Sequence, residues 1–267
     1  MPATLASIHV YPLKSCAPLT LGVARVEARG LEHDRRWMVV DADGKFITGR
    51  KHPRLTLIRA APDAGGTLHL HAPNMPQLHL SPACASSRMD VEVWGSHVAA
   101  QTASPAADDW ISTFLGIRAR FAHMDEACLR TVDPDHSQPG DIVSFADSYP
   151  LLAISQAALD QLNSRLTHPV PMLRFRPSIV IAGTQPYAED GWKRVRIGGI
   201  EFDVAKPCIR CLFTTVDFER GEFDPSGEPL RTLLTYRRTP KGVSFGQNLI
   251  ARGTGTLRVG EMVEVLA

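Results

Sequence analysis

The sequence predicts an α+β fold in which strands predominate. Short runs rich in β-branched and aromatic residues recur between turn signals through the first hundred residues, a spacing typical of a barrel or a sandwich. Two segments, residues 104–115 and 155–166, carry apolar residues at helical intervals. With 267 residues, 44% hydrophobic and 21% charged, the chain has an ordinary globular composition and room for one large domain or two modest ones.

The first half is expected to be mostly strands and turns. The predicted strands are residues 8–11, 22–27, 36–40, 45–48, 55–58, 67–71 and 89–94. Asp and Gly in the stretch 41–44 predict a hairpin turn between the third and fourth of them. Histidines alternate with leucines in residues 67–71, and no carboxylate or cysteine has matching spacing. We therefore expect these histidines to face solvent rather than bind a metal.

The middle of the chain contains both predicted helices. Residues 104–115 follow a Ser-Pro start, and Ser155 is the expected N-cap of the segment 155–166. Between them, residues 118–122 are predicted to be a strand. The stretch 133–140, with its Asp, Pro and Gly residues, is predicted to be an exposed loop, either a lid or a plain surface loop.

The last third returns to strands. Predicted strands are residues 178–182, 195–197, 200–204, 256–259 and 262–266. Gly198 and Gly199 predict a hairpin between the second and third of these strands, and the last two are expected to form another hairpin-like pair.

Charge and cysteine content exclude several classes of protein. The 29 basic and 28 acidic side chains leave a net charge near +1, so no overall attraction to nucleic acid or an anionic membrane is expected, although a local basic pocket could bind a small anion. We find no signal peptide and no apolar run approaching the ~18 residues that would span a bilayer. Five cysteines, of which Cys16, Cys84 and Cys128 are isolated, make a poor disulfide framework and favour free thiols in a reducing cytoplasm.

The stretch 206–217 is the first candidate for chemistry because Arg210 lies between Cys208 and Cys211. A thiol beside a guanidinium loses its proton more readily, and the thiolate attacks electrophiles or binds soft metals. Structural zinc would need further ligands, and a thioredoxin-like dithiol would begin a helix, whereas residues 212–216 are predicted to be a strand. In extended chain the two thiols would point to opposite faces, so only one is expected to face a given pocket.

Basic and hydroxyl side chains follow several predicted strands: Lys14, Ser15, Arg35, Arg36, Thr48, Arg50, Arg174 and Arg176. Singly each is expected to be a solvated group, but together they supply what a phosphate-bearing ligand needs. The chain has no Walker or dinucleotide-binding glycine motif, so any phosphate would be held by scattered side chains. It also lacks the Gly-x-Ser-x-Gly and His-Glu-x-x-His motifs of serine hydrolases and zincins.

Eight motifs carry a family resemblance. They are Tyr11-Pro-Leu-Lys-Ser15, Asp34-Arg35-x-Trp37, Thr48-Gly-Arg50 with Pro53-Arg-Leu55, Asp147-x-Tyr-Pro150 before Leu162-Asn-Ser-Arg165, Phe175-Arg-Pro177, Tyr187-Ala-Glu-Asp190 with Trp192, Arg210-Cys211 before Thr214-Thr-Val-Asp217, and Phe245-Gly-Gln247. In these motifs, nearly from end to end, the chain resembles the MOSC superfamily of molybdenum-cofactor proteins. It is most similar to the mitochondrial amidoxime reducing components and the bacterial reductases of N-hydroxylated bases.

The resemblance implies a fold and a set of site residues. An N-terminal β-barrel-like domain would cover residues 1–120, and a MOSC domain, a mixed β-barrel with flanking helices, would cover residues 121–267. Cys211 would ligate molybdenum and be the catalytic residue. The groups implied to hold the pterin and its phosphate are Lys14, Ser15, Arg35, Arg176 and Arg210, and those implied to line the same cofactor are Asp147, Ser148 and Asn248. Ser178 and Asn248 depart from the family pattern, since relatives often have Asn and an aromatic residue at those places.

The resemblance also implies an activity. The chain would be a cytoplasmic molybdenum-dependent oxidoreductase that reduces N–O bonds in small N-hydroxylated compounds. Because no iron–sulfur domain follows, electrons would come from a separate flavin reductase, ferredoxin or cytochrome-type protein, and neither nucleic acid nor a membrane would be a partner. The alternatives are a non-catalytic carrier of the molybdenum cofactor, a protein that delivers sulfur through a cysteine persulfide, and a scaffold with inert thiols.

Overall fold

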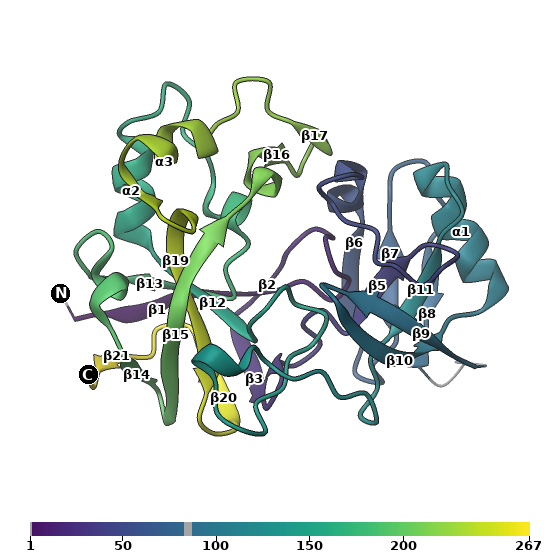
Figure 1. Ribbon diagram of the computed structural model, residues 1–267, viewed down its shortest axis with the longest axis horizontal. Helices are drawn as coiled ribbons and strands as arrows, with labels where there is room; N and C mark the ends of the chain where they lie inside the picture. Colours follow the sequence, from purple (N-terminus) through teal and green to yellow (C-terminus); the bar gives the residue numbers. More distant parts are fainter. Residues whose placement is uncertain (1, 83–86) are drawn as a thin grey trace.

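The chain folds into two lobes in the computed structural model, which describes residues 2–82 and 87–267 (Figure 1). One lobe contains β5 to β11 with α1, and the other contains the labelled strands from both ends of the chain with α2 and α3. In the described part of the chain, strands outnumber the three α-helices, so the predicted α+β class with predominant strands is confirmed. Cys84 lies outside the described residues.

The first lobe consists of two antiparallel sheets and one helix. The four-stranded sheet has the order β5 (Trp37–Val40), β11 (Arg120–His123), β10 (Ser96–Thr102), β9 (Arg88–Val93). The three-stranded sheet has the order β6 (Arg59–Pro62), β7 (Leu68–His71), β8 (Leu78–Leu80). Helix α1 (Pro105–Leu115) begins where the Ser104 hydroxyl accepts a hydrogen bond from the backbone N–H of Ala107, as its sequence predicts.

The second lobe is built on a nine-stranded sheet. Its main order is β2 (Leu19–Leu21), β1 (Thr4–Val10), β13 (Ile179–Ala182), β12 (Leu151–Ser155), β19 (Gly242–Ala251), β15 (Ile200–Arg210), β14 (Arg194–Ile197), β21 (Val263–Val265), and β18 (Arg238–Thr239) also pairs with β19. The smaller sheets are β20 (Gly255–Arg258), β3 (Val23–Glu27), β4 (Gly30–Leu31), and β16 (Val216–Asp217) with β17 (Glu222–Phe223). The pairing of β1 with β13 crosses the predicted division after residue 120, which stays a prediction.

Two helices pack on the second lobe, α2 (Gln156–Asn163) and α3 (Leu230–Tyr236). The Ser155 hydroxyl caps α2 as predicted, accepting from the N–H of Ala158 at 3.3 Å. The helix ends at Asn163, earlier than predicted, because the Asn163 side chain exchanges two hydrogen bonds with the backbone of Val170 and turns the chain back. The Asn163 side chain thus satisfies backbone groups of the segment that follows the helix.

Two predicted strands are single-turn 3₁₀ helices instead, so those predictions are wrong. Residues 55–58 overlap the 3₁₀ helix Pro53–Leu57, whose first turn suits the fixed φ of proline. Residues 212–216 overlap Leu212–Thr215, where the hydroxyls of Thr214 and Thr215 donate to the carbonyls three residues earlier. Such hydroxyl bonds compete with a sheet ladder for the backbone.

Two predicted hairpins also differ from the structure. Residues 256–259 and 262–266 do not pair with each other, because β20 pairs with β3 and β21 pairs with β14. The turn 41–44 is present, with Asp41 N–H bonded to Lys45 O, but beyond it only an isolated bridge links Phe46 to Val40. A correctly predicted turn therefore does not decide which strands pair, because the pairing depends on strands that are distant in sequence.

Candidate active site between the two lobes

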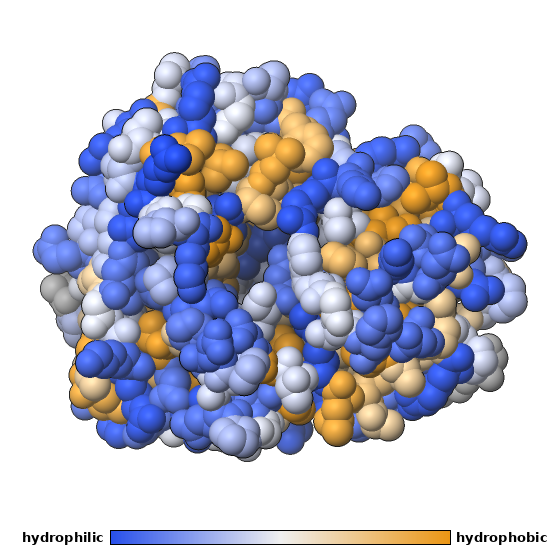
Figure 2. All heavy atoms as spheres, in the orientation of Figure 1, coloured by the Kyte–Doolittle hydropathy of each residue, from blue (hydrophilic) through white to orange (hydrophobic). Residues whose placement is uncertain are grey.

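The surface is hollowed between the two lobes (Figure 2). A pocket there brings together all of the predicted site residues: Lys14, Ser15, Arg35, Asp147, Ser148, Arg176, Arg210, Cys211 and Asn248. They come from loops and strand ends scattered over most of the chain. Their assembly is a finding of the structure, whereas the role of each residue stays a prediction.

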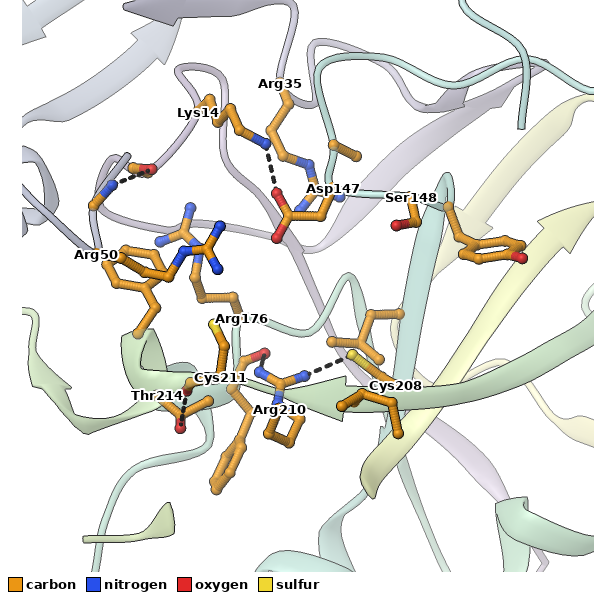
Figure 3. A pocket seen from close by; sticks show the side chains of 18 of the residues that line it. Lys14, Arg35, Arg50, Asp147, Ser148, Arg176, Cys208, Arg210, Cys211 and Thr214 are labelled. Carbon is orange, nitrogen blue, oxygen red and sulfur yellow. Dashed lines mark hydrogen bonds and ion pairs between the residues drawn. The ribbon is translucent and has the colours of Figure 1, made fainter. Parts of the chain in front are cut away.

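The end of β15 places both thiols in this pocket. Register irregularities against β19 occur between Val204 and Lys206 and between Pro207 and Ile209, and the chain turns into a 3₁₀ helix after Cys211. The expectation that only one thiol faces the pocket is therefore wrong, since the bulge and the turn break the alternation of the strand. Cys208 and Cys211 lie on either side of the Arg210 guanidinium (Figure 3).

Arg210 is held in place by two acceptors. Its Nη1 donates to Cys208 Sγ at 3.0 Å and its Nη2 to the carbonyl of Phe175 at 2.6 Å. Its Nε is buried and has no hydrogen-bond partner among the described residues. The guanidinium is thus fixed with its Nε–H unpaired among the described residues.

Arg176 likewise has a guanidinium that is anchored by one protein acceptor and keeps a buried nitrogen without a partner. Its backbone is left-handed (φ 54°) and its Nη1 donates to the carbonyl of Cys16 at 2.7 Å. The guanidinium lies over the Tyr11 ring, 3.9 Å from the centroid, and burial lowers its pKa. In the described part of the chain, Nη2 finds no hydrogen-bond partner although it is buried.

Arg35 is anchored to the buried carboxylate of Asp34. Arg35 Nη2 lies 2.5 Å from Asp34 Oδ2, and Asp34 Oδ1 accepts the N–H of Tyr11 at 2.8 Å. Burial raises the pKa of Asp34, an effect that the Arg35 charge opposes. Arg35 Nε is the third buried guanidinium N–H in the pocket without a partner among residues 2–82 and 87–267.

Lys14 and Asp147 form an ion pair across the pocket. Lys14 Nζ donates to Asp147 Oδ1 at 2.5 Å and to the carbonyl of Phe145 at 2.7 Å. Burial lowers the pKa of Lys14 to about 8. The Asp147 side chain is 70% exposed, so partial desolvation in the pocket opposes its ionisation only weakly, and the Lys14 ammonium holds its pKa well below its usual range. Asp147 is therefore ionised at neutral pH.

Gly49 contacts Ser15 on one side of the pocket and Phe213 on the other. The Gly49 N–H donates to the Ser15 hydroxyl at 3.2 Å, and a Cβ at Gly49 would lie 2.4 Å from the Phe213 ring. Real Cβ atoms do not approach so closely, so any larger residue at position 49 would push Phe213 away. Phe213 is two residues after Cys211, and its position therefore bears on the thiol.

Sequence reasoning missed some residues that line the pocket, notably Trp94 and Thr214, and considered Arg50 only as one of the phosphate-binding candidates. Trp94 and Gly95 have φ values of 52° and 77° at the turn between β9 and β10. A Trp-Gly pair between two alternating runs is a hairpin signal, but it does not reveal what the tip contacts. The Thr214 hydroxyl donates to the carbonyl of Cys211 at 2.9 Å.

Among residues 2–82 and 87–267, no group of three or more His, Cys, Asp and Glu side chains is arranged to hold a metal ion. In the same residues, no helix combines the length and the apolar character that crossing a bilayer requires.

Comparison with known proteins decides the family. Residues 2–118 match the family described as MOSC N-terminal beta barrel domain, and residues 140–264 match the MOSC domain. Over 98% of its length the chain is 35% identical to mitochondrial amidoxime-reducing component 1 of Mus musculus, covering 82% of that protein. The chain belongs to the MOSC family. The predicted resemblance is thereby confirmed.

Other relatives of this MOSC protein include an amidoxime-reducing component and a molybdenum cofactor sulfurase. It is 36% identical to mitochondrial amidoxime-reducing component 1 of Danio rerio, over 97% of this chain and 83% of that one. It is 31% identical to the molybdenum cofactor sulfurase of Oryza sativa, over 91% of this chain but 32% of that protein. The names of these relatives refer to amidoxime reduction and to the molybdenum cofactor.

Proposed function

We propose that this MOSC protein is a molybdenum-cofactor-dependent reductase of N-hydroxylated compounds. The observation that carries the proposal is Cys211 in a pocket with three buried guanidinium N–H groups that lack partners in the described chain, those of Arg35, Arg176 and Arg210. The similarity to amidoxime-reducing components supports the same reaction class.

The residues present suit the cofactor chemically. A buried N–H without a partner costs about 1–3 kcal/mol, so these guanidiniums are arranged for acceptors that a ligand would bring. Phosphate and pterin oxygens and nitrogens are such acceptors, and Arg forks recognise phosphate well. The Cys211 thiol is a soft ligand that suits molybdenum. The pocket's surplus of cations also favours an anionic ligand.

Each residue then has a proposed task. Cys211 ligates the metal, and Lys14, Ser15, Arg35, Arg176 and Arg210 hold the pterin and its phosphate. Ser148 and Asn248, together with Asp147, line the same space. When bound, the cofactor supplies two-electron chemistry that breaks the N–O bond. Two electrons and two protons are consumed, and the oxygen leaves as water.

The electrons would come from a separate donor, a flavin reductase, a ferredoxin or a cytochrome-type protein. Cys16, Cys128, Cys208 and Cys211 are all free thiols. A reducing compartment such as the cytoplasm would keep Cys211 available for the metal.

The proposal is tested by measuring molybdenum and pterin in protein purified from a host that makes the cofactor. We expect stoichiometric metal and reduction of N-hydroxybenzamidine with an artificial reductant in the wild type. In Cys211→Ala both should be lost, whereas Cys208→Ala, the matched change in the same pocket, should keep the metal. Wild-type protein that carries no molybdenum would contradict the proposal.

A second candidate is a carrier of the cofactor or a protein that delivers sulfur. The similarity to a molybdenum cofactor sulfurase and the second pocket thiol, Cys208 beside Arg210, favour it. It would bind cofactor without turning over any N-hydroxylated compound, and mass spectrometry would find a persulfide on Cys208 or Cys211.

A further inference from the structure

Two segments, one from each lobe, meet beside the pocket. Residues 48–57 of the first lobe begin among the residues that line the pocket and end in the 3₁₀ helix Pro53–Leu57. Residues 211–223 of the second lobe begin at Cys211 and end in the hairpin of β16 and β17. The hairpin packs against the 3₁₀ helix of the other lobe (Figure 1). We call these two segments the clasp.

A glycine in each segment of the clasp makes room for a side chain of the other segment. In the first lobe it is Gly49, where the Phe213 ring fills the space that a Cβ would need. In the second lobe it is Gly221, which is buried and has a φ of 66° at the end of the hairpin turn. A Cβ at Gly221 would lie 2.9 Å from Cγ and Cδ1 of Leu57 and 3.1 Å from the Cα of Arg54. The two lobes therefore close on each other through two complementary contacts, and each contact is at its tightest where one partner has no side chain.

Hydrogen bonds tie the hairpin to the chain that leaves Cys211. The carbonyl of Asp217 accepts the N–H of Gly221 at 2.7 Å and so closes the hairpin turn. Arg174, which lines the pocket, donates from Nη1 to the carbonyl of Thr215 at 3.0 Å, and its Nη2 lies 3.5 Å from Asp217 Oδ2. Because these bonds hold the turn, the hairpin and the pocket wall together, a displacement at Gly221 also displaces the backbone that follows Cys211.

We propose that Gly221 is a positioning residue for Cys211, which it holds in the pocket by seating against Leu57 and keeping the clasp closed. Lobes that meet through a limited interface move relative to one another unless specific contacts restrain them. Gly221 lies outside the residues that line the pocket, so it acts only through the chain between itself and Cys211. The position of the thiol is a property of the protein without cofactor, whereas the consequence for molybdenum rests on the proposed function.

The test inserts a side chain into the clasp with little backbone strain. Asn tolerates left-handed backbone, so Gly221→Asn mainly adds atoms against Leu57. Gly227→Asn is the matched control, because Gly227 has a φ of 74° and a Cβ there would have no described atom within 4 Å. The measured quantity is the rate at which iodoacetamide alkylates Cys211 in cofactor-free protein divided by the rate at Cys208, both followed by mass spectrometry of peptides.

Gly221→Asn should raise this ratio about fivefold or more, because an overpacked contact opens more often and an open clasp uncovers Cys211. Cys208 precedes the turn and is bonded to Arg210, and it corrects for general unfolding, which would expose both thiols alike. Gly227→Asn should stay within about twofold of the wild type. A wild-type ratio in Gly221→Asn, or an equal rise in Gly227→Asn, would overturn the inference.

Leu57→Ala tests the same contact from the first lobe and keeps the inference testable if Gly221→Asn fails to fold. It removes the side chain that seats against Gly221 and should raise the ratio about threefold or more. The control is Leu78→Ala, since Leu78 also packs in part against the core of the first lobe, and it should keep the wild-type ratio. In the double variant the two effects should multiply to less than their product, because both changes break one contact. An unchanged ratio in Leu57→Ala would overturn the inference.

Molybdenum retention separates this inference from the proposed function. In metal-loaded protein, the rate of molybdenum loss during dialysis against a chelator should rise about fivefold in Gly221→Asn and stay at the wild-type value in Gly227→Asn, since release follows the population of the open clasp. A raised thiol ratio in protein that never binds molybdenum would support the clasp and overturn the reductase. Bound molybdenum and reduction of N-hydroxybenzamidine, with a wild-type thiol ratio in Gly221→Asn, would support the reductase and overturn the clasp.

Discussion

The two walls of the pocket hold their functional groups in different ways. The cationic wall, Lys14, Arg35 and Arg176, consists of buried or nearly buried cations tied to protein acceptors. The thiol wall, Cys208, Arg210 and Cys211, lies at the partly exposed end of a bulged strand. Desolvation of the cations lowers the stability of the protein when no ligand is bound, whereas the partly exposed thiols cost little stability. An anionic ligand should therefore stabilise mainly the cationic wall, and the metal chemistry should depend mainly on the thiol wall.

The largest expected effect distinguishes the two thiols. Cys211→Ser should lower kcat/KM for N-hydroxybenzamidine about 10³-fold or more, a change of about 4 kcal/mol, because it removes the proposed metal ligand. Cys208→Ser keeps a group that can accept from Arg210 and should lose less than about tenfold. Steady-state kinetics at equal protein concentration measures both, with the molybdenum content of each variant determined alongside. Equal losses in the two variants would show that the thiol wall acts as a dithiol.

The next prediction concerns the energetic cost of the cationic wall. Burial lowers the pKa of Lys14 from 10.5 to about 8. Between these values the unfolded chain retains a proton that the folded protein has released, so the free energy of unfolding rises with pH. The contribution reaches up to about 3 kcal/mol and is absent in Lys14→Met. Denaturant titrations at pH 8 and pH 10.5 measure it as the free energy of unfolding of the wild type minus that of the variant. A difference that falls or stays flat with pH would contradict the prediction.

Arg176→Lys tests the shape of the cationic wall rather than its charge. Lys retains the charge but cannot reproduce a guanidinium that bonds Cys16, stacks on Tyr11 and presents a free N–H. We expect about tenfold weaker cofactor retention, measured as pterin left after dialysis. The control is Arg220→Lys on the exposed surface, which should retain pterin like the wild type. Full retention in Arg176→Lys would mean that charge alone holds the ligand.

The smallest effect concerns the turn after Cys211. The buried Thr214 hydroxyl donates to the carbonyl three residues before it, and Thr214→Val should lower the free energy of unfolding by about 1 kcal/mol. Thr235 makes the same kind of bond on exposed α3, and Thr235→Val should change stability by less than about 0.5 kcal/mol. Thermal unfolding of the two variants compares them. A greater loss of stability in Thr235→Val than in Thr214→Val would contradict the prediction.

Local signals and motifs predicted much of this molecule. Ser104 and Ser155 cap the helices where the sequence places them, because an N-cap depends on its immediate neighbours. The family motifs led to residues that the fold gathers in one pocket. The resemblance did this, since no spacing rule would join Lys14 to Asp147 across 133 positions.

Features that depend on distant contacts were not predictable. The bulge near Cys208 depends on register against β19, and the partners of β20 and β21 lie in strands remote in sequence. Trp94 was recognisable as part of a strand-turn pattern, yet its bond to Asp147 exists only because the two lobes meet. Strand propensity failed at Thr214 because its hydroxyl found a backbone acceptor within its own turn.

The pairing of β1 with β13 has a consequence for biosynthesis. Thr4 lies opposite Ala182, so β1 leaves the ribosome long before its neighbour has been translated. Meanwhile the strands β5 to β11 already form a complete sheet system and can fold early. One edge of β1 can pair early with β2, but the edge that faces β13 then stays unpaired and open to aggregation. The nascent chain therefore needs shielding at its first strand, and slow translation of residues 124–182 would lengthen that exposure.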